Sequence, residues 1–156
     1  MRKMLIYADA SVVGGCEDAE FAADSLALWR AFVQGRYTLV LSEHTLRELA
    51  GAPEPVRRRL EEVPEPNRIV LTDSDEADLL AEAYLSHRIV GPGNRSDCLH
   101  VALATVAAAD VLVSWNFKHI VNVGKIRLFS AVNLERGYRP IDIRSPKEVL
   151  PDDEDI

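Results

Sequence analysis

Short apolar segments that alternate with helix-length segments constrain the fold of this chain most strongly. Buried strands are predicted at residues 4–8, 37–41 ("YTLVL"), 110–115 ("DVLVSW") and 141–143 ("IDI"), while "RIVLT" is a short strand or an extended segment. Strands separated by helices pair in parallel, in a sheet that helices cover on both faces. The expected fold is therefore α/β, a three-layer α/β/α sandwich with a central, mostly parallel sheet, and residues 1–150 form a single domain.

Capping residues and helix breakers place the helices between these strands. Ser42 is a favourable N-cap for one helix, Asp73 or Ser74 for a second, and Ser96 for the most apolar helix, "DCLHVALATVAAA". The segment through "GGCED", before the helix at about 19–35, is expected to be a loop. "EHTLRELAGAP", "PVRRRLEEV" and "EADLLAEAYLSH" complete the set of predicted helical segments.

Carboxylates and one amide lie near the ends of these strands. Asp9 directly follows the first strand, and Asn116 follows the strand "DVLVS". Glu48 lies in the helix after the second strand, and Asp97 opens the most apolar helix. In open parallel sheets, ligands bind outside the carboxyl ends of the strands. Oxygen ligands gathered there suit a hard cation such as Mg²⁺ or Mn²⁺.

Four stretches carry these residues: "YADASVVGG", "LSEHTLRELAGAP", "SDCLHVALA" and "LVSWNFKHI". From Met4 to about Leu150, the chain that contains them resembles PIN-domain nucleases of the VapC type, the toxins of type II toxin–antitoxin systems. The first three stretches are similar to the segments that supply this family's acids. The fourth stands where the family usually has an Asp-containing loop. The resemblance implies a PIN-like fold.

The resemblance also implies a metal-dependent endoribonuclease that hydrolyses RNA phosphodiester bonds with a metal-activated water. Asp9, Glu48 and Asp97 would be catalytic residues that hold Mg²⁺ or Mn²⁺, and Asn116 would complete the set. The candidates for contacting the substrate are Ser11, Lys118 and His119, the last two at a phosphate. A homodimer and inhibition by a small antitoxin protein are further implications.

Asn116 departs from the family pattern, which often has a fourth carboxylate at this place. An amide can donate its carbonyl oxygen to Mg²⁺, directly or through water, but it adds no charge to hold a second ion. Three carboxylates and one amide therefore indicate one firmly held metal. Any second metal would arrive with the substrate phosphate.

Each acid also has an explanation that needs no metal. Asp9 can cap the turn that follows it, and Glu48 can pair with a neighbouring arginine such as Arg47. Asp97 is favourable at a helix N-terminus without any ligand. His100, one helical turn from Asp97, either orients a carboxylate or is a hydrogen-bonded core histidine.

Two other functions compete with the nuclease. One is a catalytically weak PIN-fold module that binds RNA or protein, which the acidic net charge and Asn116 favour. The other is a phosphatase with Asp9 as its nucleophile, similar to haloacid-dehalogenase-like enzymes. That motif needs a second Asp two residues later, where this chain has Ser11, so we discount it.

The formal net charge of −7 argues against a nucleic-acid partner, but the charge is unevenly distributed. The tail "PDDEDI", residues 151–156, carries four acids and is expected to be disordered. Residues 115–147 contain seven Lys or Arg against two acids, so the chain can form a local basic face. No apolar run approaches the ~20 residues of a membrane helix, and no signal peptide is evident. We therefore expect a cytoplasmic protein with two free thiols, Cys16 and Cys98.

Overall fold

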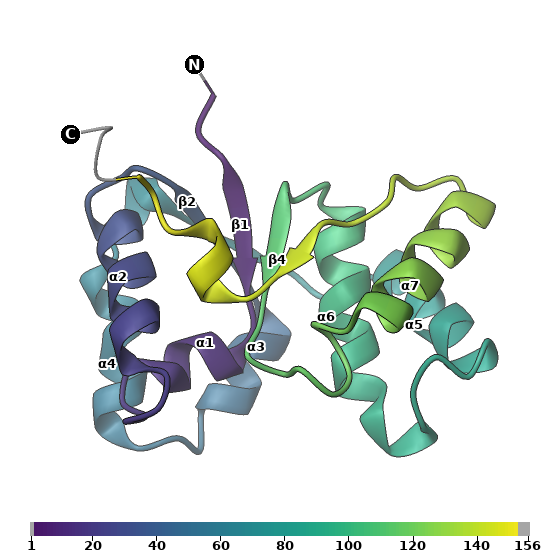
Figure 1. The fold of residues 1–156 in the computed structure, drawn as a ribbon, viewed down its shortest axis with the longest axis horizontal. Helices are drawn as coiled ribbons and strands as arrows, with labels where there is room; N and C mark the ends of the chain where they lie inside the picture. The colour runs from purple at the N-terminus through teal and green to yellow at the C-terminus, as the bar shows by residue number, and fades with distance from the viewer. Residues whose placement is uncertain (1, 153–156) are drawn as a thin grey trace.

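The central sheet has five strands, all parallel, in the order β3-β2-β1-β4-β5, in a computed structural model that describes residues 2–152 (Figure 1). The expected parallel sheet is thereby confirmed. The acidic tail predicted at 151–156 lies mostly outside the described residues. The strands are β1 (Leu5–Ala8), β2 (Thr38–Ser42), β3 (Arg68–Leu71), β4 (Val111–Val113) and β5 (Ile143–Arg144).

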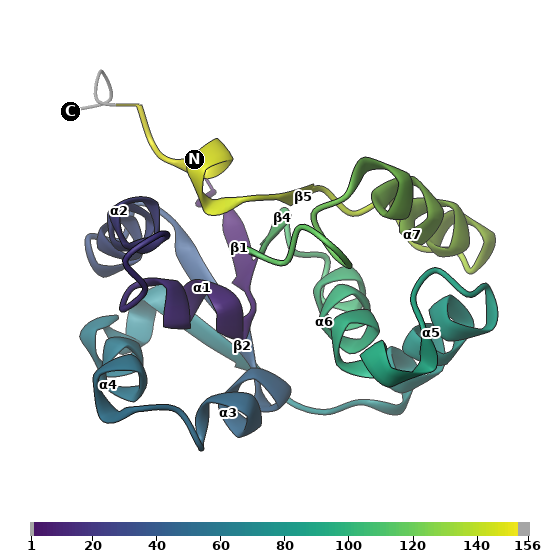
Figure 2. The ribbon, with the colours of Figure 1, turned by 60° about the horizontal axis from the view of Figure 1, so that its bottom comes forward.

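Helices cover both faces of the sheet, as the alternating pattern predicts. Figures 1 and 2 show α1, α2 and α4 on one side of the strands, and α5, α6 and α7 on the other. Within residues 2–152, no helix has the length and apolar character needed to cross a membrane. The α-helices are α1 (Ala10–Gly15), α2 (Ala22–Val33), α3 (Glu43–Leu49), α4 (Glu54–Glu62), α5 (Asp75–Ser86), α6 (Arg95–Val106) and α7 (Val123–Glu135). Three 3₁₀ turns are η1 (Glu65–Asn67), η2 (Pro92–Asn94) and η3 (Pro146–Val149).

The core consists of one apolar cluster on each face of the sheet. Successive residues of β1 point to opposite faces, so Ile6 packs with α1 and α2, while Tyr7 packs with α5 and α6. Each cluster contains one of the two cysteines, both free and buried. Burial raises the pKa of Cys16 to about 11 and that of Cys98 to about 12.

The strand order places a topological switch point between β1 and β4. From β1 the chain passes to β2 and β3 on one side, and it returns to β4 and β5 on the other. The connections therefore leave the carboxyl ends of β1 and β4 in opposite directions, and in open parallel sheets ligands bind at such a point. Asp9 is the residue after β1, and Ser114 is the residue after β4.

The sequence prediction was wrong at two helices and at one cap. Residues 10–15 form α1 instead of a loop, because the Asp9 side chain caps Ser11 N and the helix buries Val12 and Val13. Residues 123–135 form α7, which the sequence analysis did not predict and which Asn122 caps. Ser96 does not cap α6, because the helix already begins at Arg95.

Two neighbouring glycines of α1 differ in the space around them. A Cβ on Gly15 would lie 2.5 Å from Ser25 Oγ and 2.8 Å from Trp115 Nε1, whereas a Cβ on Gly14 would meet nothing within 4 Å. Trp115 donates a 2.8 Å hydrogen bond to Ser25 and stacks on Phe21, with ring centroids 4.4 Å apart. The indole is therefore packed against α1 and the start of α2.

We predict that Gly15→Ala lowers the free energy of unfolding by about 1–3 kcal/mol, because the new methyl group forces Ser25 and Trp115 apart. Gly14→Ala is the matched control. It should leave stability unchanged or raise it by up to about 1 kcal/mol, since alanine favours the helix. Urea unfolding monitored by tryptophan fluorescence measures both variants, and equal stabilities for the two would contradict the prediction.

Candidate metal centre

The carboxylate of Asp9 is held at the end of β1 by hydrogen bonds from two loops. Its Oδ1 accepts from Ser11 N at 3.1 Å and from Ser11 Oγ at 2.6 Å, and its Oδ2 accepts from Ser114 Oγ at 2.6 Å. The residue is only 4% exposed. Asp9 therefore caps α1, but the cap leaves part of the hydrogen-bonding capacity of the carboxylate unused. A carboxylate can accept about four hydrogen bonds, so Oδ2 retains one acceptor position.

Asn116 connects the loop after β4 to the start of α6. Its backbone N–H donates to Ser114 Oγ at 2.9 Å, and its side-chain Nδ2 donates to Asp97 Oδ1 at 3.2 Å. Its Oδ1 accepts from His119 N at 2.9 Å, which fixes the orientation of the amide. In this arrangement Asn116 positions Asp97, and its oxygen keeps one acceptor position for a further partner.

Asp97 is the acid of the candidate site whose pKa is raised. Burial raises the pKa of its carboxyl group, and the nearby carboxylates of Asp9 and Glu48 act in the same direction. His119 and His100 oppose the shift without cancelling it. Asp97 receives one hydrogen bond from the described residues, on Oδ1. The carboxyl group of Asp97 is thus close enough to Asp9 and Glu48 to be affected by their charges.

Glu48 faces His100 and not an arginine. Its Oε1 lies 2.5 Å from His100 Nε2, and its Oε2 accepts from Ser96 Oγ at 3.0 Å. Burial opposes ionisation of Glu48, but these hydrogen bonds outweigh it and lower the pKa of the carboxyl group. Arg47, the alternative partner, instead pairs with Asp73 at 2.9 Å.

His100 is held from its other side by a buried hydroxyl chain. Its Nδ1 lies 2.8 Å from Tyr7 OH, which lies 2.7 Å from Ser42 Oγ. The imidazole is 3% exposed. His100 is therefore both a hydrogen-bonded core histidine and a residue that orients a carboxylate, and that carboxylate is Glu48.

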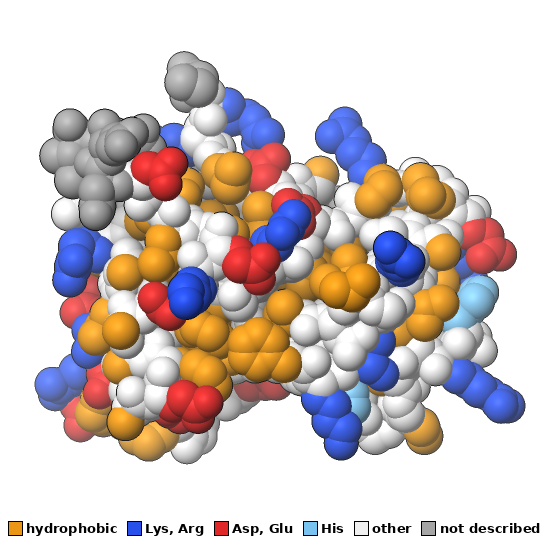
Figure 3. Space-filling model, viewed as in Figure 1, with side chains coloured by type: hydrophobic (Ala, Val, Ile, Leu, Met, Phe, Trp, Pro, Cys, Tyr) orange, Lys and Arg blue, Asp and Glu red, His pale blue; other side chains and the backbone are white. Residues whose placement is uncertain are grey.

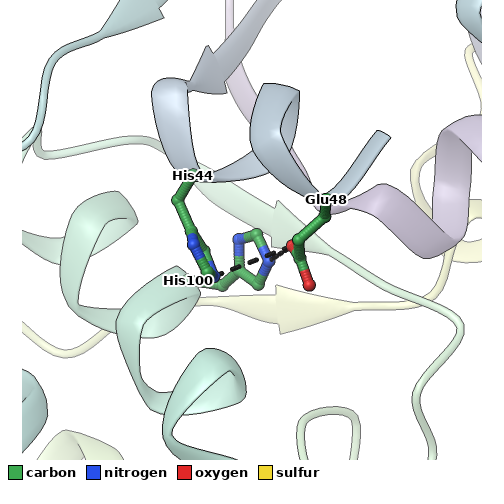
Figure 4. Close-up of side chains that lie close together, drawn as sticks. All are labelled: His44, Glu48 and His100. Atoms are coloured by element: carbon green, nitrogen blue, oxygen red, sulfur yellow. Dashed lines mark hydrogen bonds and ion pairs between the residues drawn. The ribbon is translucent and has the colours of Figure 1, made fainter. Parts of the chain in front are cut away.

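His44 is a neighbour of Glu48 that the sequence analysis missed. It lies four residues earlier on α3, and its Nε2 is 3.7 Å from Glu48 Oε1 and 2.7 Å from Ser96 Oγ. Figure 4 shows the two imidazoles and the Glu48 carboxylate pointing toward one another. Burial and the neighbouring His100 lower the pKa of His44. The four-residue spacing on one helix was the signal available in the sequence.

The residues proposed to contact substrate differ in their surroundings. Ser11 is committed to Asp9 and to Trp115 N, which donates to its Oγ at 2.9 Å. Lys118 is exposed. The Nδ1 atom of His119 is buried and has no hydrogen-bond partner among the described residues. Of the three, Lys118 is the one with a charge open to solvent.

Two of the basic residues of 115–147 are engaged within the protein. Arg144 is paired with Asp142 at 2.8 Å and with Glu148 at 3.2 Å, and Lys125 Nζ donates to a backbone carbonyl of Ile89. Figure 3 shows Lys and Arg side chains spread singly over the visible face and interspersed with acids. A negatively charged partner would therefore meet isolated cations on this face.

Similarity to a solved structure supports the fold but does not assign this chain to a family. No protein-family model matches the sequence, and no curated protein sequence matches it. A solved structure of VapBC2 from Rickettsia felis bound to a DNA fragment from their promoter contains a similar chain, with a TM-score of 0.57 and 13% sequence identity. The match covers 91% of this chain and 98% of that one. The observed sheet and its helical layers are consistent with a PIN-like fold.

We predict that Asp97→Asn stabilises the metal-free protein at pH 7. The pKa of Asp97 is raised in the folded state, so folding is favoured below the unfolded pKa and loses that contribution as pH rises through the folded pKa. A neutral amide removes this penalty while its oxygen still accepts from Asn116. A gain of about 1 kcal/mol would raise Tm by about 2–4 °C.

Thermal melts in the presence of a chelator, at pH 4 and pH 7, measure the effect. The difference between Asp97→Asn and the parent should shrink at pH 4, because the raised pKa of Asp97 favours protonation of its carboxyl group in the folded state as the pH falls. Glu61→Gln, at an exposed position of α4, is the control and should change Tm little at either pH. A lower Tm for Asp97→Asn at pH 7 would contradict the prediction.

Proposed function

We propose that this protein is a metal-dependent endoribonuclease of the VapC type, with Asp9, Glu48 and Asp97 as the residues that hold Mg²⁺ or Mn²⁺. The observation that carries the proposal is that the charges of Asp9 and Glu48 both act on the half-buried carboxyl group of Asp97, beside the ends of β1 and β4. Burial raises the pKa of Asp97 most, these two charges add to the shift, and a bound cation would favour the ionised carboxylate. The similarity in fold to the VapBC2 complex supports the same reading.

The donor set fits a hard cation. Asp9 Oδ2 keeps one acceptor position, Asp97 Oδ2 accepts no hydrogen bond from the described residues, and the Glu48 side chain is 34% exposed. Mg²⁺ and Mn²⁺ prefer oxygen ligands of this kind. Asn116 would contribute its remaining oxygen lone pair or act through water.

The protein's own residues supply positioning for the reaction. Ser11 and Ser114 fix the Asp9 carboxylate, Asn116 orients Asp97, and His100 orients Glu48. A bound divalent cation would lower the pKa of a water molecule and screen the charge of the scissile phosphate. Lys118, exposed beside the site, would contact the RNA backbone, and His119 Nδ1 would take a hydrogen bond from substrate or water.

The proposal includes the partners and compartment expected of such a toxin. They are an RNA substrate, a small antitoxin protein, a second copy of the chain in a homodimer, and the cytoplasm. The protein in the similar solved structure is part of a VapBC2 complex, which supports an antitoxin partner here.

A PIN-fold module with weak catalysis remains the second candidate. Asn116 favours it, because the amide donates to Asp97 and so partly satisfies the negative charge without a metal. The same cleavage assays separate the two candidates, since a binding module would retain RNA without hydrolysing it at any metal concentration.

We predict that Asp9→Asn lowers RNA cleavage by on the order of 100-fold or more while the fold is retained. The amide can keep its oxygen toward Ser11, and Ser114 can rotate its hydroxyl to accept from the new NH₂ group. Cleavage of a pool of single-stranded and hairpin RNA oligonucleotides, titrated with Mn²⁺, measures activity, and circular dichroism checks the fold.

Glu43→Gln is the control, because Glu43 lies on α3 with Glu48 but accepts from the backbone of Asp73 instead. It should cleave at the parent rate. Parent-level cleavage by Asp9→Asn would disprove the nuclease site, and absence of cleavage by the parent would favour the binding module.

We predict that Asn116→Asp tightens Mn²⁺ binding by about tenfold. The added charge attracts the cation by ~1 kcal/mol at 4 Å in a water-like medium and by more in a partly buried site. The same charge replaces a donor to Asp97 with a repelling carboxylate, so the metal-free variant should be less stable at pH 7. Isothermal titration and thermal melts measure the two effects, and unchanged affinity would show that residue 116 faces away from the metal.

A further inference from the structure

A second group of ligand atoms shares Glu48 with the proposed Mg²⁺ or Mn²⁺ site but has a different chemistry. His100 Nε2 and His44 Nε2 lie 2.5 Å and 3.7 Å from the same oxygen of Glu48. All three atoms lie within 4.8 Å of one another, and no other three His, Cys, Asp or Glu side chains in residues 2–152 are grouped so closely. We propose that His44, Glu48 and His100 form a binding site for a transition-metal cation of the Zn²⁺ class.

The donor set determines the class of cation. Two imidazole nitrogens and one carboxylate oxygen suit Zn²⁺ and related transition metals, whereas Mg²⁺ prefers oxygen ligands throughout. Ligands about 2.0–2.1 Å from Zn²⁺ in a tetrahedral arrangement are about 3.3 Å apart. The separations of 2.5 Å and 3.7 Å around Glu48 Oε1 lie on either side of that value, so small side-chain rotations bring the donors into place.

Two helices hold the donors on facing surfaces. His44 and Glu48 are four residues apart on α3 and therefore share one face of that helix, a spacing that also brings pairs of metal ligands together in other helical sites. His100 projects from α6 toward that face, with its ring centroid 4.6 Å from that of His44 (Figure 4).

The surrounding hydroxyl groups are compatible with a metal-binding tautomer of His100. If Nδ1–H donates to Tyr7 OH, Tyr7 can in turn donate to Ser42 Oγ, and Nε2 is left with a lone pair for the cation. A partner on the second ring nitrogen is a regular feature of metal-binding histidines. Tyr7 can also reverse its role and donate to Nδ1, which accommodates the tautomer that donates to Glu48 without a metal.

The site is accessible from solvent on one side. The side chains of His44 and Glu48 are 15% and 34% exposed, while that of His100 is 3% exposed. A cation can therefore enter along the outer surface of α3, and water can supply the fourth ligand. Neither cysteine competes, because Cys16 and Cys98 are buried in separate apolar clusters.

The test measures binding directly and does not depend on nuclease activity. Full-length protein, stripped with a chelator, is titrated with Zn²⁺ in competition with a chromogenic chelator. We expect one Zn²⁺ per chain, with His44→Ala weakening binding by at least about tenfold. His87→Ala is the matched control, since His87 is near Glu135 at the end of α5 and should leave the affinity unchanged.

His44→Ala is the decisive variant, because His44 lies at the rim of the site and its loss should not unfold the protein. Co²⁺ provides a second measurement. The parent and His87→Ala should give the visible d–d absorption of four-coordinate Co²⁺, and His44→Ala should lose it. Parent-level Zn²⁺ affinity in His44→Ala, or absence of Zn²⁺ binding by the parent, would overturn the proposal.

Discussion

The hydrogen bonds to Asp9 join the two central strands at the point where the connections diverge. β1 and β4 pair in parallel up to Ala8 and Val113, and Asp9 N continues the ladder to Val113 O. Beyond that point the chain must leave the sheet in two directions, and the Asp9 carboxylate bridges the departing segments through Ser11 and Ser114. A charged group this deeply buried is tolerated because three donors surround it. The same donors fix its direction, so one set of hydrogen bonds both joins the two strand ends and orients the acid.

The other acids are positioned by elements that are distant in the sequence. Glu48 comes from α3 and is oriented by α6 through His100, while Asp97 comes from α6 and is oriented by the loop after β4 through Asn116. Each acid is thus held by a segment other than its own, and the site is formed only when the layers on both faces have packed. The negative charges of Asp9 and Glu48 disfavour ionisation of Asp97 in the folded protein. This lowers the free energy of unfolding, and packing of the core must compensate for it.

The strand pattern predicted the sheet because strands that are buried on both faces are runs of apolar residues. Such runs can be recognised from the local sequence alone. The acids at strand ends could also be identified, since parallel topology determines where strand ends meet. α1 escaped prediction because its six residues include two glycines, and its stability comes from the Asp9 cap and the packing of Val12 and Val13. The partners of Glu48 could not be predicted either. His100 is separated from it by 52 residues, and only the packing of α3 against α6 decides that it displaces Arg47 as the neighbour.

The two cysteines divide between the apolar clusters on opposite faces of the sheet. Each thiol is buried, and its raised pKa keeps it protonated and unreactive while its own layer stays closed. Each apolar cluster therefore contains one thiol whose reactivity reports when that cluster opens. The relative rates at which Cys16 and Cys98 react with an alkylating reagent record whether the two halves open together, as one cooperative unit, or separately. That comparison distinguishes global unfolding from local opening of a single layer.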